Sequence, residues 1–306
     1  MGTLEGKLKD DPFHEILVLQ AGSIGPLQSQ DPAEKIEPRD TSLSLSGDLM
    51  SSSWNQSAQS TASDEDSESM RQQSSSTPMV YQLVDSSTPT GGFAHSNTVE
   101  VACQFGFFTA DTLLHYCWNV LLQTITTTLP FIEGSYKAFR AAGDHNKALQ
   151  DWELMDQYLS ACLTSHVSRR ASCVQGSGML RAFSACFPQI RPIVQQLKRS
   201  AKRRNGGHGP TCFGAICGLL RLPSQQAISM FLYCTARDLV NAAVRMNLVG
   251  PLEGAGLTQV LCQSTEQLLR EEGHEILHWK DAHQVSPVIE TLANAHDRLY
   301  TRLFNS

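Results

Sequence analysis

The sequence predicts an all-α fold, an irregular bundle of about eight to ten helices that follows a disordered N-terminal extension. From residue 79 onward, apolar residues recur at the three- and four-residue spacing of helices. Alternating β-branched patterns typical of strands are missing, and the connections are too irregular for a repeat array. Before that point Ser, Asp, Glu, Gln and Pro dominate, a composition that buries too little apolar surface to fold. We therefore expect an extension at 1–78 and a helical domain at 79–306.

The extension contains serine runs and an acidic group at 64–68. Its simplest interpretation is an unstructured spacer, and the alternative is a regulatory segment whose serines are phosphorylated. A short apolar patch at 16–19, behind Phe13, is either a docking segment or a vestigial strand. The first residues mix acidic and basic side chains without a long apolar stretch. This is typical of neither a secretory signal nor an Arg-rich transit peptide.

In the helical domain, the first strong apolar stripe follows Asp111, a candidate N-cap. A second stripe follows Asp151, which is a candidate N-cap in the same way. A third helix is expected over 166–187, ending before Pro188. The two stripes consist of Leu113, Leu114, Cys117, Trp118 and Leu121, and of Trp152, Met155, Leu159 and Cys162.

Two further helices are predicted nearer the C-terminus. Pro223 suits a first helical position, because its missing N–H would be unpaired there anyway, and the helix that it begins extends to about Met246. The last helix begins at Ser286 and Pro287 and carries an apolar stripe as far as Leu303. This stripe consists of Val288, Ile289, Leu292, Ala295, Leu299 and Leu303.

Composition limits the class of protein. The nine cysteines are dispersed and mostly flanked by apolar residues, and no C-x-x-C pair occurs. This pattern predicts reduced thiols in a cytoplasmic protein rather than a disulfide framework. The net charge of −6 does not indicate a nucleic-acid binder. No run of about eighteen apolar residues occurs, so no membrane span is predicted.

The sequence lacks the common nucleotide-binding and nucleophile motifs. The glycine-rich stretch 206–210 lacks the lysine and the preceding strand of a P-loop. No G-x-G-x-x-G follows a strand, and no G-x-S-x-G occurs. Because no nucleophile, base and oxyanion donor can be assembled, we expect a non-enzymatic protein with no tightly bound cofactor and no metal site of its own.

One metal-like pattern leaves an alternative open. His274, Glu275 and His278 fit H-E-x-x-H, and two histidines at i and i+4 can bind a metal on one helix face. His283 is the nearest candidate for a third ligand. A solvated helix face is the simpler interpretation, because so short a pattern is frequent by chance. The alternative is a metallohydrolase.

A basic cluster leaves a second alternative. It consists of Lys198, Arg199, Lys202, Arg203 and Arg204 and precedes the glycine-rich stretch. The simpler interpretation is a solvated helix end, where cations complement the helix dipole. The alternative is a helical interaction scaffold that binds acidic or nucleic-acid partners through residues 198–204.

The stretch 83–100 carries the most information about function. Pro89 fixes its own φ and pushes the preceding residue toward an extended conformation, so a helix does not run through this point. Gly91 and Gly92 permit a sharp turn or a close backbone approach. The turn then sets Phe93, His95, Ser96 and Glu100 at the start of the next helix.

The motif Pro-Thr-Gly-Gly-Phe-Ala-His-Ser at 89–96, followed by Glu100, resembles the UreF family of urease accessory proteins, particularly its eukaryotic members. Further stretches resemble the family in the same order. They are 168–176, with Arg170 and Gln175, then 208–218, 239–245, and the closing 296–306. The sequence departs from the family where Asn97-Thr98-Val99 replaces the usual Phe-Gly-Leu, and where 253–256 replaces Asp-Gly-Gln.

The resemblance implies a cytosolic, dimeric, all-helical protein that works in urease maturation. Family members bridge the UreD/UreH scaffold and the UreG GTPase, which delivers nickel to apo-urease. Nickel and GTP would then be handled by these partners and not by this chain.

The resemblance also implies roles for particular residues. Pro89, Gly91, Gly92 and Phe93 would shape the turn, and His95, Ser96 and Glu100 would contact a partner or, alternatively, cap the next helix. Arg170 and Gln175 would serve dimer or GTPase contacts or, alternatively, an internal network. Asn241 and Arg245 would pin the long helix to a neighbour. Tyr300, Arg302, Leu303 and Phe304 would dock into the scaffold partner; the alternative is packing on their own bundle.

Overall fold

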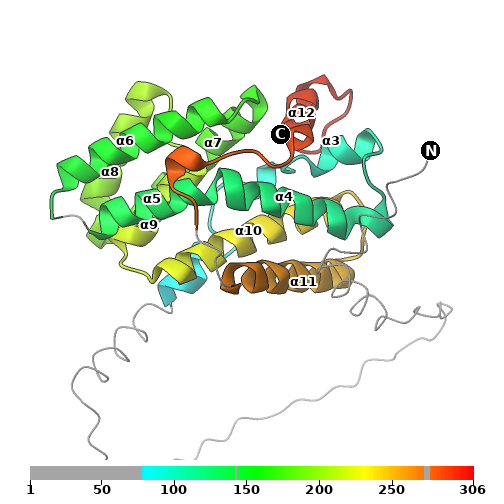
Figure 1. Ribbon diagram of the computed structural model, residues 1–306, viewed down its shortest axis with the longest axis horizontal. Helices are drawn as coiled ribbons and strands as arrows, with labels where there is room; N and C mark the ends of the chain where they lie inside the picture. The colour runs from blue at the N-terminus through cyan, green and yellow to red at the C-terminus, as the bar shows by residue number, and fades with distance from the viewer. Residues whose placement is uncertain (1–77, 142, 272–275) are drawn as a thin grey trace, which may run out of the picture. The chain divides into compact units, whose positions relative to one another are not determined.

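The structure is a computed structural model that describes residues 78–141, 143–271 and 276–306 (Figure 1). All of them belong to one unit, which spans 61–306. Within these ranges every regular element is a helix and no strand is found, which confirms the predicted fold class. None of the described helices is long and apolar enough to cross a bilayer. The acidic group at 64–68 and the patch at 16–19 lie outside the described residues.

A helix at 78–84 comes first. The α-helices that follow are α3 (Val99–Gln104), α4 (Leu113–Thr127), α5 (Leu129–Arg140), α6 (His145–Cys162), α7 (His166–Cys186), α8 (Arg191–Arg204), α9 (Gly209–Leu219), α10 (Ser224–Arg245), α11 (Pro251–Arg270) and α12 (Pro287–Ala295). Short 3₁₀ turns connect them: η1 (Gly92–Ala94), η2 (Ala110–Thr112), η3 (Pro188–Ile190), η4 (Trp279–Asp281) and η5 (His296–Arg298).

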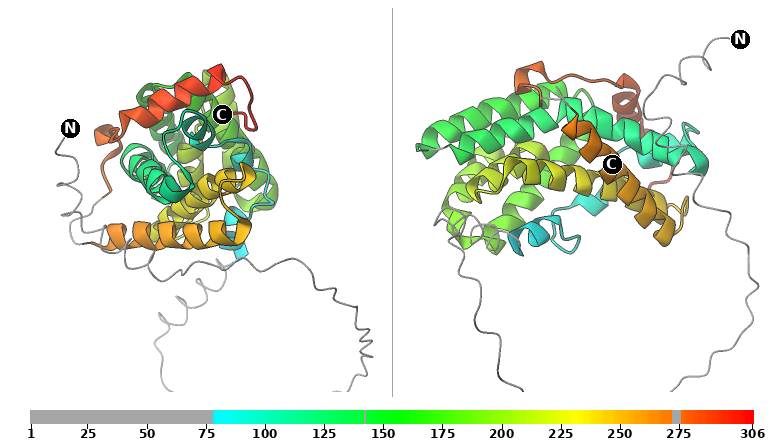
Figure 2. Two further views of the ribbon diagram at one scale, coloured as in Figure 1. Left: turned by 90° about the vertical axis from the view of Figure 1, so that its right-hand side faces the viewer. Right: turned by 60° about the horizontal axis from the view of Figure 1, so that its bottom comes forward.

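Helix α9 is the centre of the core. Its residues 209–218 are buried, as expected for a helix that is apolar on all sides. Two glycines let its backbone approach α5 closely. A Cβ at Gly214 would lie 2.2 Å from the Ile132 carbonyl oxygen, and one at Gly218 would lie 2.6 Å from that of Tyr136. The outer helices pack around this pair, with α11 along α10 on one side of the bundle and α12 on the other (Figure 2).

Two predicted helix caps are wrong. Asp151 lies inside α6, whose N-cap is Asp144; the Asp144 carboxylate accepts from the Asn146 N–H at 2.8 Å. Asp111 lies inside η2, which begins after Thr109, where the Thr112 hydroxyl accepts from the Thr109 N–H at 2.9 Å. In α6 an earlier polar residue satisfies the free backbone groups, so the helix starts before its apolar stripe. Helix α4 starts at Leu113, the first residue of its stripe, with Thr112 as its N-cap. The predictions for 166–187 and 223–246 agree with α7 and α10 to within one residue.

The predicted last helix is too long. Helix α12 ends at Ala295, η5 follows, and 299–306 is irregular. The amides of Leu303 and Phe304 do not donate to carbonyls one turn back, as they would in a helix. They donate to the Glu100 carboxylate of α3 instead. A contact about 200 residues away in the sequence therefore ends a helix that the local apolar spacing would continue.

Candidate functional site

The turn at 89–96 is pressed between two helices. Gly91 has φ of 87°, a left-handed conformation that favours glycine, and the Ala94 N–H donates to its carbonyl at 3.1 Å. A Cβ at Gly92 would lie 2.5 Å from a carboxylate oxygen of Asp238 on α10. A Cβ at Gly178 of α7 would lie 2.5 Å from the Thr90 carbonyl oxygen. Glycine on both sides thus lets the turn sit against α7 and α10.

His95 and Ser96 are buried and face the C-terminal segment, defined here as 296–306. The Ser96 amide and hydroxyl both donate to the Ser306 main-chain oxygen, at 2.6 and 3.0 Å. His95 Nδ1 lies 2.5 Å from the Ser306 hydroxyl oxygen. Burial, and then the nearby Arg170 and His296, lowers the pKa of His95 to about 4, so its imidazole is neutral at neutral pH.

Glu100 holds the same segment one turn further along. Its side chain is 1% exposed. One carboxylate oxygen accepts from the Leu303 N–H at 2.6 Å. The other accepts from the Phe304 N–H at 3.3 Å and lies 3.0 Å from His296 Nε2. A buried carboxylate needs such partners, because without them its desolvation is unfavourable.

Asp297 connects the C-terminal segment to α7. Arg170 donates to both of its carboxylate oxygens, at 2.8 and 3.1 Å, in the bidentate geometry that arginine favours. Arg302 and His166 also contact Asp297, at 3.2 and 3.1 Å. The hydrogen bonds from Arg170, followed by those from His166, hold the pKa of Asp297 well below its usual range.

Arg245, near the end of α10, contacts both segments at once. It donates to the Phe93 carbonyl oxygen at 2.6 Å, and its guanidinium lies 4.3 Å from the centre of the Phe304 ring. The Phe304 side chain is buried between these elements. The cation–π contact and the hydrogen bond together fix Phe304 against the turn.

The opposite side of the C-terminal segment is apolar and faces solvent. Tyr300 is fully exposed, and Leu303 is 64% exposed. Gln104 of α3 donates to the Thr301 carbonyl oxygen at 3.2 Å, which places the end of α3 beside them. Phe105 and Phe107, which follow α3, are about half exposed. We call Tyr300, Leu303, Phe105 and Phe107 the apolar face.

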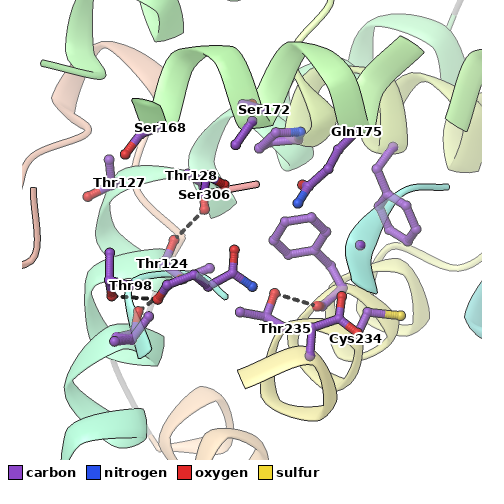
Figure 3. A pocket seen from close by; sticks show the side chains of 18 of the residues that line it. Thr98, Thr124, Thr127, Thr128, Ser168, Ser172, Gln175, Cys234, Thr235 and Ser306 are labelled. Atoms are coloured by element: carbon purple, nitrogen blue, oxygen red, sulfur yellow. Dashed lines mark hydrogen bonds between the residues drawn. The ribbon is translucent and has the colours of Figure 1, made fainter. Parts of the chain in front are cut away.

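Gln175 lines a cavity of about 230 Å³ between α4, α7 and α10, which many hydroxyl groups also line (Figure 3). Gly92 of the turn and His296 and Ser306 of the C-terminal segment line the same cavity. The labelled lining residues are Thr98, Thr124, Thr127, Thr128, Ser168, Ser172, Gln175, Cys234, Thr235 and Ser306. Of the residues predicted for the site, the structure therefore brings the turn, Glu100, Arg170 and the C-terminal segment together, and Gln175 lines a cavity that borders them.

The glycine-rich stretch 206–210 is bound within the domain. Asp156 of α6 is buried and accepts from the amides of Gly207 and His208, at 2.7 and 2.8 Å, and from the Thr211 hydroxyl at 2.6 Å. These donors at the start of α9 are therefore occupied by a side chain of the same chain.

The metal pattern can be followed only in part. His274 and Glu275 lie outside the described residues. The ring of His278 accepts from the Lys280 N–H at 3.3 Å as the N-cap of η4. Among the described residues, no group of three or more His, Cys, Asp or Glu side chains is arranged to hold a metal ion.

Comparison with known proteins identifies the family. A family model described as UreF matches residues 108–262. The urease accessory protein F of Oryza sativa subsp. indica is 34% identical over 232 residues, which covers 73% of this chain and 83% of the rice protein. The chain belongs to the UreF family. The predicted resemblance to eukaryotic UreF proteins is thereby confirmed.

Other UreF relatives extend the comparison. Urease accessory protein F of Arabidopsis thaliana is 32% identical over 234 residues, covering 74% of this chain and 91% of the plant protein. Urease accessory protein 6 of Cryptococcus neoformans is 25% identical over 305 residues, covering 74% and 96%.

Sequence reasoning missed two residues of the UreF site. Asp297 and His296 lie within the closing motif, but neither stood out there as a binding residue. The available signal was their polarity, because they lie in a short stretch that also carries Arg298 and Arg302. Only the fold shows that their partners, Arg170 and Glu100, come from α7 and α3.

Proposed function

We propose that this UreF-family chain is a non-enzymatic urease accessory protein that bridges a UreD/UreH-type scaffold protein and a UreG-type GTPase during nickel insertion into apo-urease. It works as a cytoplasmic homodimer, and nickel and GTP are handled by its partners. The family membership and the names of the relatives support the urease role.

The observation that carries the bridging proposal is the apolar face. The C-terminal segment is held from inside by Glu100, His95 and Arg170, and it presents Tyr300 and Leu303 to solvent. A segment that is ordered before binding loses less conformational entropy when a partner docks. Exposed aromatic and aliphatic side chains on such a support are typical anchors of a protein interface.

The turn residues have a supporting role in this proposal. His95, Ser96 and Glu100 are buried, so they act on a partner through the C-terminal segment that they position. Phe304 acts in the same way, because it is buried against Arg245. Direct contacts fall to Tyr300 and Leu303, with Arg302 at their edge.

Arg170 is half exposed beside this segment and also serves a dimer or GTPase contact. Gln175 of α7, which is half-buried and lines the cavity, takes part in such a contact indirectly, by supporting α7.

Deletion and complementation test the urease role. We expect a host that lacks this protein to accumulate urease protein without nickel-dependent urease activity, and the intact chain to restore that activity. Full activity in the deletion strain would reject the proposal. Normal complementation by a chain with both Tyr300→Ser and Leu303→Ser would keep the urease role and reject the apolar face as its basis.

A further inference from the structure

Helix α8 presents a row of basic side chains that the proposed function does not use. Arg191, Lys198, Arg199, Lys202 and Arg203 are all exposed. Their spacing of i, i+7, i+8, i+11 and i+12 places them along one side of the helix. We call Lys198, Arg199, Lys202 and Arg203 the basic face.

Most of this charge is not neutralised. Glu153 of α6 pairs with Arg203 at 3.1 Å and with Arg204 at 3.8 Å. In the described part of the chain, no ion pair is formed by Lys198, Arg199 or Lys202. Basic residues at i and i+4 repel one another, so the helix carries an unfavourable interaction that a bound anion would relieve.

The helix dipole does not account for the whole basic face. Favourable dipole interactions are confined to about the last turn of a helix. That turn contains Lys202, Arg203 and Arg204, whereas Lys198 and Arg199 precede it. The helix dipole therefore leaves the charges of the two earlier cations uncompensated, and an acidic segment docked on this face would compensate them.

We propose that the occupant is the acidic segment of the same chain at residues 64–68. It contains four carboxylates in five positions, Asp64, Glu65, Asp66 and Glu68, and so matches the charge of the basic face. Phosphorylation of Ser63 or Ser67 would add about −1.5 to −2 charge each and strengthen the contact. The segment thereby shields the basic face from other polyanions.

The reach of the linking chain is comparable to the size of the domain. The acidic segment lies ten residues before Pro78, where the described domain begins. Ten extended residues span about 35 Å, and a compact domain of this size, with a radius of gyration of roughly 17 Å, is about 45 Å across. A short tether of this kind gives an effective concentration in the millimolar range, so a weak contact is sufficient.

The experiment measures the reactivity of Lys198 and Lys202 in the full chain. A neutral acylating reagent is applied at low salt, and modification is followed by mass spectrometry with the exposed Lys147 of α6 as internal reference. A segment at an effective concentration of about 1 mM, with a Kd of about 0.1–1 mM, protects these lysines about two- to tenfold. The protection disappears near 1 M salt, where the Debye length is about 3 Å.

Two matched variants of the extension give the decisive comparison. The change D64N/E65Q/D66N/E68Q abolishes the protection, whereas D31N/E34Q/E37Q/D40N, which also neutralises four carboxylates, leaves it intact. Equal reactivity of Lys198 and Lys202 in both variants would overturn the proposal. So would salt-sensitive binding of a DNA oligonucleotide to the unmodified chain without any lysine protection, because the basic face would then be a nucleic-acid site.

A carbodiimide cross-link separates docking within one chain from docking between copies. In a mixture of ¹⁴N- and ¹⁵N-labelled protein, we expect residues 64–68 to join Lys198 or Lys202 in peptides of a single isotope. Mixed-isotope peptides would contradict an intramolecular contact.

Discussion

Replacement of Glu100 by alanine should release the C-terminal segment from the domain. The change removes the acceptor of the Leu303 and Phe304 amides and the partner of His296 Nε2. Hydrogen bonds to a charged group contribute about 1.5–3 kcal/mol each, so the two amide bonds set an upper range of about 3–6 kcal/mol. The real loss is smaller, because a segment that detaches lets its amides bond to water.

We therefore expect the free energy of holding the segment to fall by about 2–4 kcal/mol, which corresponds to about 30- to 1000-fold faster amide exchange. Hydrogen exchange of Leu303 and Phe304 measures this directly. The exposed Glu266, which pairs with Arg270 at 2.9 Å, gives the control, and Glu266→Ala should leave both rates unchanged. If exchange at Leu303 and Phe304 in the Glu100→Ala protein stays within twofold of the original, Glu100 does not hold the segment.

Three further pairs of substitutions, each a test and its control, probe other parts of the structure. Gly178→Ala drives a Cβ toward the Thr90 carbonyl oxygen and should lower the free energy of unfolding in urea by about 1–3 kcal/mol; Gly256→Ala, in an open position of α11, should raise it by about 0.5–1 kcal/mol. Because the pKa of His95 is lowered to about 4 from an unfolded value near 6.5, the folded state binds fewer protons, and stability should fall as pH decreases from about 6.5 to 4. His95→Gln should reduce that pH dependence in urea melts, and His115→Gln, at an exposed position, should leave it unchanged. Asp156→Ala deprives three donors of their acceptor and should destabilise the domain by about 2–4 kcal/mol, against less than about 0.5 kcal/mol for the exposed Asp151→Ala in the same helix.

The sequence alone predicts a helix well where interactions within that helix determine its length. The apolar spacing of α7 and α10 continues without interruption, and both helices end at the predicted residues or next to them. The same rule fails at 296–303, because the amides there bond to Glu100 and not to the preceding turn. The assignment of caps fails at Asp111, because a 3₁₀ turn precedes α4 and makes Thr112 its N-cap. It fails at Asp151, because Asp144 satisfies the first free backbone groups of α6 seven residues earlier.

The two halves of the candidate site could each be found in the sequence, but their contact could not. The turn at 89–96 and the closing motif are separated by about 200 residues, and no periodicity relates His95 to Ser306 or Arg170 to Asp297. His95 and Ser96 both contact Ser306 of that segment, so their burial could not be read from the turn alone. For this reason the sequence suggested side chains at an open mouth, whereas the structure places them beneath the C-terminal segment.

The most direct test of the central claim is binding of the full chain to a UreD/UreH-type scaffold protein. The double variant Tyr300→Ser and Leu303→Ser removes the exposed anchors but leaves the inward contacts of the segment in place. Leu252→Ser removes an equally exposed apolar side chain at the start of α11 and is the control. We predict that the double variant loses at least tenfold in affinity, about 1.4 kcal/mol or more, while the control binds normally. Equal binding by both proteins would contradict the assignment of the apolar face as the docking surface.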